Sequence, residues 1–256
     1  MKIAFFDSGI GGLTVLNEAM KKLPNEEFVY FADTLHVPYG TKSKEEVSAF
    51  VKQSVEMIIE EDVKALVIAC NTATSIAVSE LRAIYNFPII GMEPAVKPAV
   101  EMNRTTGKRV LVMATPLTLK QTKYNELISR VDDQSIVDSL PLPELVRYCE
   151  NLNFEENVMI DYFKSKLSTF NIHSYGTVVL GCTHYPFYRD ILKKILPDVQ
   201  IVDGSIGTVN RLIHLLSDNN QLKTQGDSSI KFMCSNHDQQ YIEKMKTALN
   251  ILISKR

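Results

Sequence analysis

Short apolar runs alternate along the whole chain with longer segments in which apolar residues recur every three or four positions. The short runs predict strands and the longer segments predict helices. The predicted strands span residues 2–6, 27–31, 65–69, 88–90, 109–114, 135–139, 177–181, 199–202 and 230–234. The predicted helices span residues 13–23, 43–62, 74–85, 95–102, 115–129, 155–167, 186–195 and 206–216, and a last helix follows residue 234. This alternation predicts an α/β protein with two similar, doubly wound, mostly parallel lobes and a site between them.

Two stretches of the sequence are close to being copies of each other. In residues 65–74 and 177–186 an aliphatic run ends at a cysteine, Cys70 or Cys182, and small hydroxyl or amide residues follow. A buried parallel strand would carry each thiol to its carboxyl end, where open α/β sheets bind their ligands. We therefore expect one site with a thiol on either side.

Composition narrows the class of partner. The chain has 256 residues, of which 45% are hydrophobic and 23% charged, and its formal net charge is −2. This balance gives no broad attraction to nucleic acid or to anionic membrane surfaces. No apolar run reaches the roughly 20 residues that a membrane-spanning helix requires, and the first apolar run is too short for a secretory signal. We expect a cytoplasmic protein with a small-molecule partner.

The four cysteines lack the spacing of a disulfide framework or a zinc site, so we expect free thiols and no metal site. Cys149 and Cys234 lie in an amphipathic segment and a short strand, and we interpret them as small buried side chains. Cys70 and Cys182 each lie between a strand and a predicted helix, where the helix dipole favours a thiolate. These two are the candidates for chemistry.

Two further segments could contribute to the site. Asp7 and Ser8 end the first predicted strand and open a glycine-rich turn, where they either face a ligand or cap the next helix. The turn lacks the spacing of a nucleotide-binding loop. The loop at residues 32–40 carries an acid, a histidine and a tyrosine and could cover the site.

Three kinds of chemistry could use the thiols. Cys182 and His184 could act as nucleophile and base, which would leave Cys70 idle. Two sulfurs within bonding distance could form a redox pair. Alternatively, one base on each face of a flat carbanion could remove a proton from one side and return it from the other, as inversion of a stereocentre requires. In that case Asp7 could assist Cys70 and His184 could assist Cys182.

The strand-end motifs together resemble the cofactor-independent glutamate racemases of bacterial cell-wall synthesis. The matching stretches follow each other in the family's order at residues 6–12, 32–33, 37–40, 69–73 and 180–186. The resemblance implies that Cys70 and Cys182 interconvert L- and D-glutamate as alternating acid and base on opposite faces of Cα, without a cofactor. It further implies that Asp7 and His184 assist the thiols. The substrate's charged groups would be held by Asp7, Ser8, Tyr39, Gly40, Asn71, Thr72, Thr183 and His184.

The resemblance also implies how the lobes divide the chain. The first lobe would comprise residues 1–96 and 208–256, carrying Asp7 and Cys70. The second would comprise residues 97–207, carrying Glu150, Cys182 and His184. The sequence does not fix the oligomeric state, and a homodimer remains open.

One motif departs from the family. The assisting glutamate of the family usually ends a Phe-Val-Pro-Leu-(Val/Ile)-Glu run, whereas residues 145–150 of this chain read Leu-Val-Arg-Tyr-Cys-Glu. Register favours Glu150 as the assisting acid, with Glu144 as the alternative. Other functions also stay open: a two-thiol racemase for aspartate or another amino acid, a catalytically quiet amino-acid-binding protein, or a cysteine hydrolase that uses Cys182 and His184.

Overall fold

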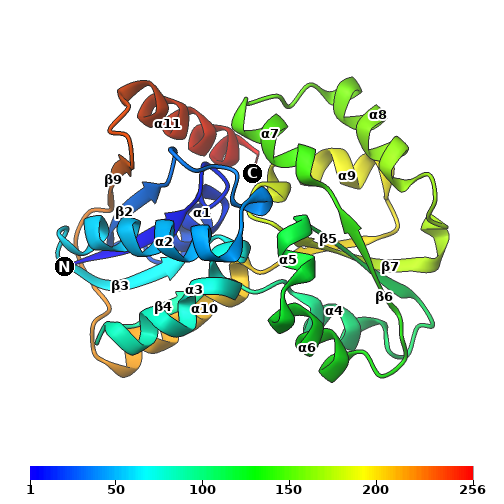
Figure 1. Cartoon of the computed structure of the whole chain (residues 1–256), viewed down its shortest axis with the longest axis horizontal. Helices are drawn as coiled ribbons and strands as arrows, with labels where there is room; N and C mark the ends of the chain where they lie inside the picture. The colour runs from blue at the N-terminus through cyan, green and yellow to red at the C-terminus, as the bar shows by residue number, and fades with distance from the viewer. Residues whose placement is uncertain (256) are drawn as a thin grey trace.

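The computed structural model describes residues 1–255 as two lobes, each built on a sheet of parallel strands (Figure 1). The first sheet has the order β4-β3-β1-β2-β9 and the second the order β6-β5-β7-β8. The first contains β1 (Lys2–Asp7), β2 (Glu27–Ala32), β3 (Val63–Ile68), β4 (Ile89–Gly91) and β9 (Ser229–Cys234). The second contains β5 (Arg109–Ala114), β6 (Val137–Pro141), β7 (Tyr175–Gly181) and β8 (Gln200–Asp203). The predicted two-lobed parallel α/β architecture is confirmed.

The two sheets share one topology. In the first sheet the strands run β2-β1-β3-β4, and in the second they run β6-β5-β7-β8 in the same relative order. The winding direction therefore reverses between β1 and β3, and again between β5 and β7. Open α/β sheets bind ligands at such reversal points, beyond the carboxyl ends of the strands. Cys70 follows β3 and Cys182 follows β7, so the two thiols occupy equivalent positions.

Helices cover both faces of each sheet (Figure 1). On the first sheet, one face carries α1 (Leu13–Lys22), α10 (Ser205–Asp218) and α11 (Gln239–Ser254), and the other carries α2 (Lys44–Ile59) and α3 (Asn71–Ile84). On the second sheet, one face carries α4 (Val96–Asn103), α5 (Pro116–Lys120) and α6 (Thr122–Val131), and the other carries α7 (Pro143–Glu150), α8 (Glu156–Leu167) and α9 (Arg189–Ile195). None of the helices in residues 1–255 is both long and apolar enough to cross a membrane.

Local sequence explains how these elements begin and pack. Ser43 and Glu46 form a capping box at the start of α2, each satisfying the other's backbone N–H. Val47, Val51 and Val55 follow at helical spacing and are buried against the sheet. Strands β1, β2 and β3 of the first sheet are buried on both faces, as parallel strands between two helix layers must be.

The chain passes from the first sheet to the second between β4 and α4, and returns between β8 and α10. Strand β9 then pairs with β2, with Phe28 opposite Ile230, and adds the last strand to the first sheet. One apolar cluster continues from the α1 side of the first sheet to the α7 side of the second, and it includes Leu13 and Leu145. The precise lobe limits near residues 96 and 208 stay a prediction.

Several predicted helix limits were wrong. The predicted helix at residues 115–129 is two helices, because Gln121 takes an extended conformation between α5 and α6. Helix α3 begins at Asn71, three residues earlier than predicted. The segment after Cys182 first forms the 3-10 helix η3 (Tyr185–Tyr188), and α9 starts only at Arg189. The expected helix dipole is therefore present behind Cys70 and absent directly behind Cys182.

Candidate active site

A small cavity of about 20 Å³ lies between the lobes, at the carboxyl ends of β1, β3, β5 and β7. Its walls are formed by Ser8, Pro38, Tyr39, Gly40, Cys70, Asn71, Thr72, Thr115, Val146, Gly181, Cys182, Thr183 and His184. Both thiols therefore face one space, one from each lobe. A cavity of this size has room for about one water molecule.

The start of a helix positions the Cys70 thiol, and a neighbouring acid affects its pKa. Its Sγ is the N-cap acceptor of α3 and receives the Ala73 N–H at 3.5 Å. Burial raises the pKa of the Cys70 thiol well above its ordinary value, and the negative charge of Asp7 raises it further. The Ala73 amide and the Ser8 hydroxyl act in the opposite direction. Cys70 therefore carries its proton in this state of the site.

Cys182 contacts a histidine, which in turn contacts a glutamate. Its Sγ lies 3.7 Å from His184 Nδ1, and His184 Nε2 lies 2.7 Å from Glu150 Oε1. Burial alone would lower the pKa of His184, but its hydrogen bonds to Cys182 and Glu150 outweigh burial and raise the pKa well above the ordinary value. An imidazolium backed by a carboxylate therefore lies beside Cys182.

Asp7 is fully buried and connects the lobes. Its Oδ2 accepts the Thr183 hydroxyl at 2.9 Å, and its Oδ1 accepts the Gly9 N–H at 2.9 Å. Burial raises the pKa of Asp7, while the charge of His184 and these two hydrogen bonds oppose the rise. The N-cap of α1 is Gly12, without a side-chain hydrogen bond. Asp7 and Ser8 therefore do not cap that helix, and Asp7 acts on Cys70 through its charge.

The loop after β2 covers the site as expected. Tyr39 and Gly40 line the cavity, and the Tyr39 hydroxyl donates to Asp33 Oδ2 at 2.6 Å. His36 Nδ1 lies 2.9 Å from the same carboxylate. A Cβ on Gly40 would come within 2.8 Å of Thr115 Cβ, so glycine permits this loop to touch the second lobe. Asp33 holds Tyr39 in place rather than lining the cavity.

Asn71 and Thr72 also line the cavity. Asn71 Nδ2 donates to the Met92 carbonyl, whereas Asn71 Oδ1 is buried and has no protein partner within the described residues. Thr72 Oγ1 lies 3.2 Å from Thr115 Oγ1 and 3.0 Å from Thr118 Oγ1. These hydrogen bonds join the first lobe to the second. Asn71 therefore combines a buried, unpartnered acceptor with a place in the wall of the cavity.

Thr115 and Val146 line the cavity and were missed from the sequence. A signal for Thr115 was present, because it directly follows β5 as Ser8 directly follows the equivalent strand β1. Val146 lies within α7, in the run that departs from the family pattern. Its apolar side chain gave no sign of a site.

The two candidate glutamates occupy opposite ends of α7. Glu150 contacts His184, and only 12% of its side chain is exposed. Glu144 instead receives the Tyr162 hydroxyl at 3.1 Å and pairs with Lys166 at 3.0 Å, with 46% of its side chain exposed. The geometry therefore brings Glu150 to the site and leaves Glu144 on the surface.

The remaining cysteines and a second cavity lie apart from this chemistry. Cys149 and Cys234 are free and buried, as predicted. Within residues 1–255, no group of three or more His, Cys, Asp or Glu side chains could hold a metal ion.

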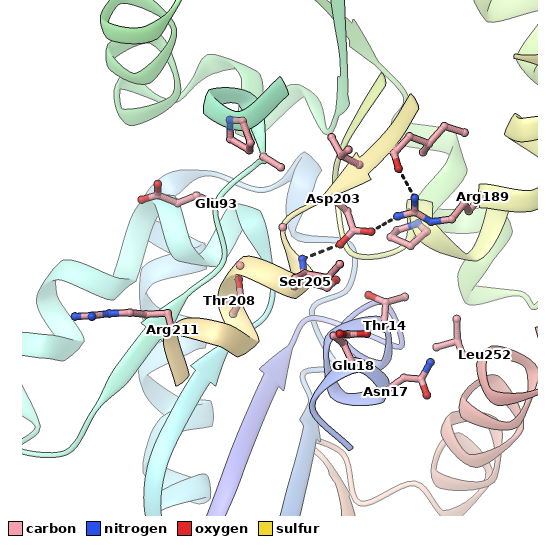
Figure 2. A pocket seen from close by; sticks show the side chains of 18 of the residues that line it. Thr14, Asn17, Glu18, Glu93, Arg189, Asp203, Ser205, Thr208, Arg211 and Leu252 are labelled. Carbon is pink, nitrogen blue, oxygen red and sulfur yellow. Dashed lines mark hydrogen bonds and ion pairs between the residues drawn. The ribbon is translucent and has the colours of Figure 1, made fainter. Parts of the chain in front are cut away.

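A larger cavity of about 770 Å³ lies where the chain crosses between the lobes, near the ion pair of Arg189 and Asp203 (Figure 2). It contains neither Cys70 nor Cys182 in its wall.

Comparison with known proteins agrees with this geometry. A family model described as Asp/Glu/Hydantoin racemase matches residues 13–212. The chain belongs to the Asp/Glu/Hydantoin racemase family. Among curated members, the glutamate racemase of Halothermothrix orenii is 51% identical over 254 residues, which cover 98% of this chain and 99% of that protein. Glutamate racemase 2 of Bacillus subtilis is 50% identical over 256 residues, which cover 98% and 96%.

Solved structures of racemases have the same two-lobed fold. Escherichia coli glutamate racemase, solved in complex with L-glutamate and the activator UDP-MurNAc-ala, matches this racemase-family chain with a TM-score of 0.84. The two sequences are 29% identical, and the match covers 96% of this chain and 95% of the other. The two lobes are thus arranged as in a known member of the family.

Proposed function

We propose that this protein is a glutamate racemase that inverts Cα by proton transfer between two cysteines. The observation that supports this most directly is the placement of Cys70 and Cys182 at equivalent strand ends, facing one small cavity from opposite lobes. A hydrolase would use one thiol and leave the other without a role. Glutamate is favoured as substrate because curated relatives about half identical over nearly the whole chain are glutamate racemases.

Cys70 holds a proton in this state of the site, which suggests which thiol acts as the acid in one direction of the reaction. The Cys182 thiolate, beside the His184 imidazolium, takes the proton from Cα, and the electron pair of the C–H bond stays on the substrate as a carbanion. The Cys70 thiol then gives its proton to the opposite face of Cα. The enzyme is left with a Cys70 thiolate and a Cys182 thiol, the form from which the reverse direction starts. Each thiol is a general acid in one direction and a general base in the other.

The walls of the cavity supply the groups that such a carbanion needs. The unpaired Oδ1 of Asn71 can accept a hydrogen bond from the substrate ammonium. Amides at the start of α3 can donate to carboxylate oxygens. The hydroxyls of Ser8 and Thr183 donate to Asp7, so their oxygens can accept from the substrate ammonium. Donors fixed in a site that excludes water stabilise developing negative charge best.

Glutamate requires the lobes to open. A space of about 20 Å³ cannot admit an amino acid, so the contacts that close the cavity must separate for binding and release. Those contacts are the hydrogen bonds from Thr183 to Asp7 and between Thr72 and Thr115, together with the packing of Gly40 on Thr115. Closure then excludes water from the carbanion.

The deciding experiment incubates the purified protein with D-glutamate in D2O under reducing conditions, without added cofactor. Loss of optical activity together with loss of the Cα proton signal is expected. Reaction with aspartate or another amino acid, and none with glutamate, would retain the mechanism and replace the substrate. No reaction with any amino acid would favour a catalytically quiet binding protein.

The cellular part of the proposal is supply of D-glutamate to peptidoglycan synthesis in the cytoplasm. It is supported by the resemblance to glutamate racemases of cell-wall synthesis. Deleting the gene in a host without another source of D-glutamate should make growth depend on added D-glutamate, and a Cys70→Ser copy should not restore it.

A further inference from the structure

Helix α11 of the first lobe reaches across to the glutamate of the second lobe. The Tyr241 hydroxyl donates to Glu150 Oε2 at 2.6 Å. The Lys244 ammonium donates to the Glu150 carbonyl at 3.0 Å and lies 3.4 Å from Oε2. Lys244 also lies over the Tyr241 ring, 3.8 Å from its centroid. Figure 1 shows α11 beside α7, the helix that carries Glu150 at its end.

These contacts leave Glu150 little freedom. Oε2 is held by α11, while Oε1 accepts the Ile10 N–H at 2.9 Å and contacts His184 Nε2 at 2.7 Å. The contacts with α11 and Ile10 thus fix the carboxylate plane, and the fixed carboxylate in turn holds the His184 ring. An imidazole held at Nε2 in this way presents Nδ1 to the sulfur of Cys182.

We propose that Tyr241 and Lys244 are positioning residues of the racemase, which hold Glu150 so that His184 is oriented and charged beside Cys182. This inference rests on the proposed function. Neither residue lines the catalytic cavity, and both act through Glu150. The consequence is that the Cys182 side of the site depends on α11, whereas the Cys70 side does not.

Electrostatics supports the arrangement. Burial opposes a charge on Glu150, but contacts with His184, Tyr241 and Lys244 together hold its pKa at about 2. An ionised Glu150 in turn helps to raise the pKa of His184. Removing one donor makes the carboxylate more basic but lets it turn, so His184 loses a fixed partner at Nε2.

The chain contains a matched control on the same helix. Glu144, at the other end of α7, also receives a tyrosine hydroxyl and a lysine ammonium, from Tyr162 and Lys166. That lysine likewise lies over its tyrosine ring, at 5.5 Å. Tyr162→Phe and Lys166→Met therefore remove chemically equivalent contacts that do not lead to His184.

The test compares Tyr241→Phe with Tyr162→Phe in two measurements. The first is racemisation of glutamate: Tyr241→Phe should lower kcat about tenfold with KM changed less than about twofold, because a hydrogen bond to a charged group is lost. The second is the ratio of alkylation of Cys182 to that of Cys70, read by peptide mass spectrometry after a limited reaction with iodoacetamide. This ratio should fall at least about threefold in Tyr241→Phe, because a smaller fraction of Cys182 would then be present as the thiolate. It should stay unchanged in Tyr162→Phe.

The outcomes separate positioning from simple loosening of the fold. Both cysteines share one cavity, so a loosened structure would raise the alkylation of both, and that result would overturn the proposal. Equal effects of Tyr241→Phe and Tyr162→Phe would overturn it as well. Lys244→Met should repeat the loss and Lys244→Arg should restore most activity, so the test survives poor folding of one variant. If the wild-type protein does not racemise glutamate, the proposed function fails, while the alkylation ratio still tests the role of α11.

Discussion

The two thiols occupy the same place in the topology of their lobes, but the charged groups next to them have opposite signs. Cys70 lies at the N-cap of the 14-residue helix α3, next to the negative charge of Asp7. Cys182 is followed by a 3-10 helix, and its partner is the His184–Glu150 pair. A repeated fold thus supplies two equivalent positions, and the side chains around each position make them different.

This difference matches what a racemase needs at the start of a turnover. One sulfur must hold a proton while the other is free to take one. Burial and Asp7 keep the proton on Cys70, whereas a cation lies beside Cys182. Two identical surroundings would give both sulfurs the same protonation and leave the site without an acid or without a base.

The largest effect is expected from removal of either sulfur. Cys70→Ser and Cys182→Ser should each lower racemisation by at least about 10³-fold, because a hydroxyl is a far weaker acid than a thiol and is almost never deprotonated near neutral pH. Deuterium exchange at Cα without inversion should survive for one enantiomer in each variant, and for opposite enantiomers in the two. Full turnover in either variant would rule out the two-thiol mechanism.

A smaller effect is expected from Glu150→Gln, which keeps the shape and removes the charge behind His184. Activity should fall about 10²-fold. Because the carboxylate helps to raise the pKa of His184, its loss lowers that pKa, and the imidazolium is lost at a lower pH. The alkaline decline of kcat should therefore move to lower pH than in the wild type. Glu144→Gln is the control and should change kcat less than about twofold, as a surface ion pair contributes little. Similar pH profiles for the two variants would contradict this assignment.

A still smaller effect is expected from Gly11→Ala. A Cβ at Gly11 would overlap the His184 ring and the Thr183 hydroxyl, so the imidazole must shift from its position beside Cys182. A loss of about tenfold in kcat is expected from such a displacement. Gly207→Ala is a matched control, because a Cβ there meets open space within α10. Unchanged kinetics in Gly11→Ala would show that His184 tolerates a different position.

Much of this organisation could be predicted from the sequence. Apolar runs that end at Cys70 and Cys182 revealed both strands and both thiols, because a parallel strand buried on two faces leaves a distinctive pattern. The break at Gln121 was missed, since nothing local to that residue disfavours a helix. The ties from Tyr241 and Lys244 to Glu150 join positions about ninety residues apart. Such contacts depend on how α11 docks, which no local pattern encodes.

The order of strands along the chain also determines when each half of the enzyme can form during synthesis. Residues 109–203 supply every strand of the second sheet, whereas the first sheet lacks an edge until β9 has left the ribosome. Domains commonly fold in the order in which they are translated. Here the lobe that is translated first is completed last. Tyr241 and Lys244 emerge later still, so a nascent chain carries both cysteines before it carries the side chains that contact Glu150.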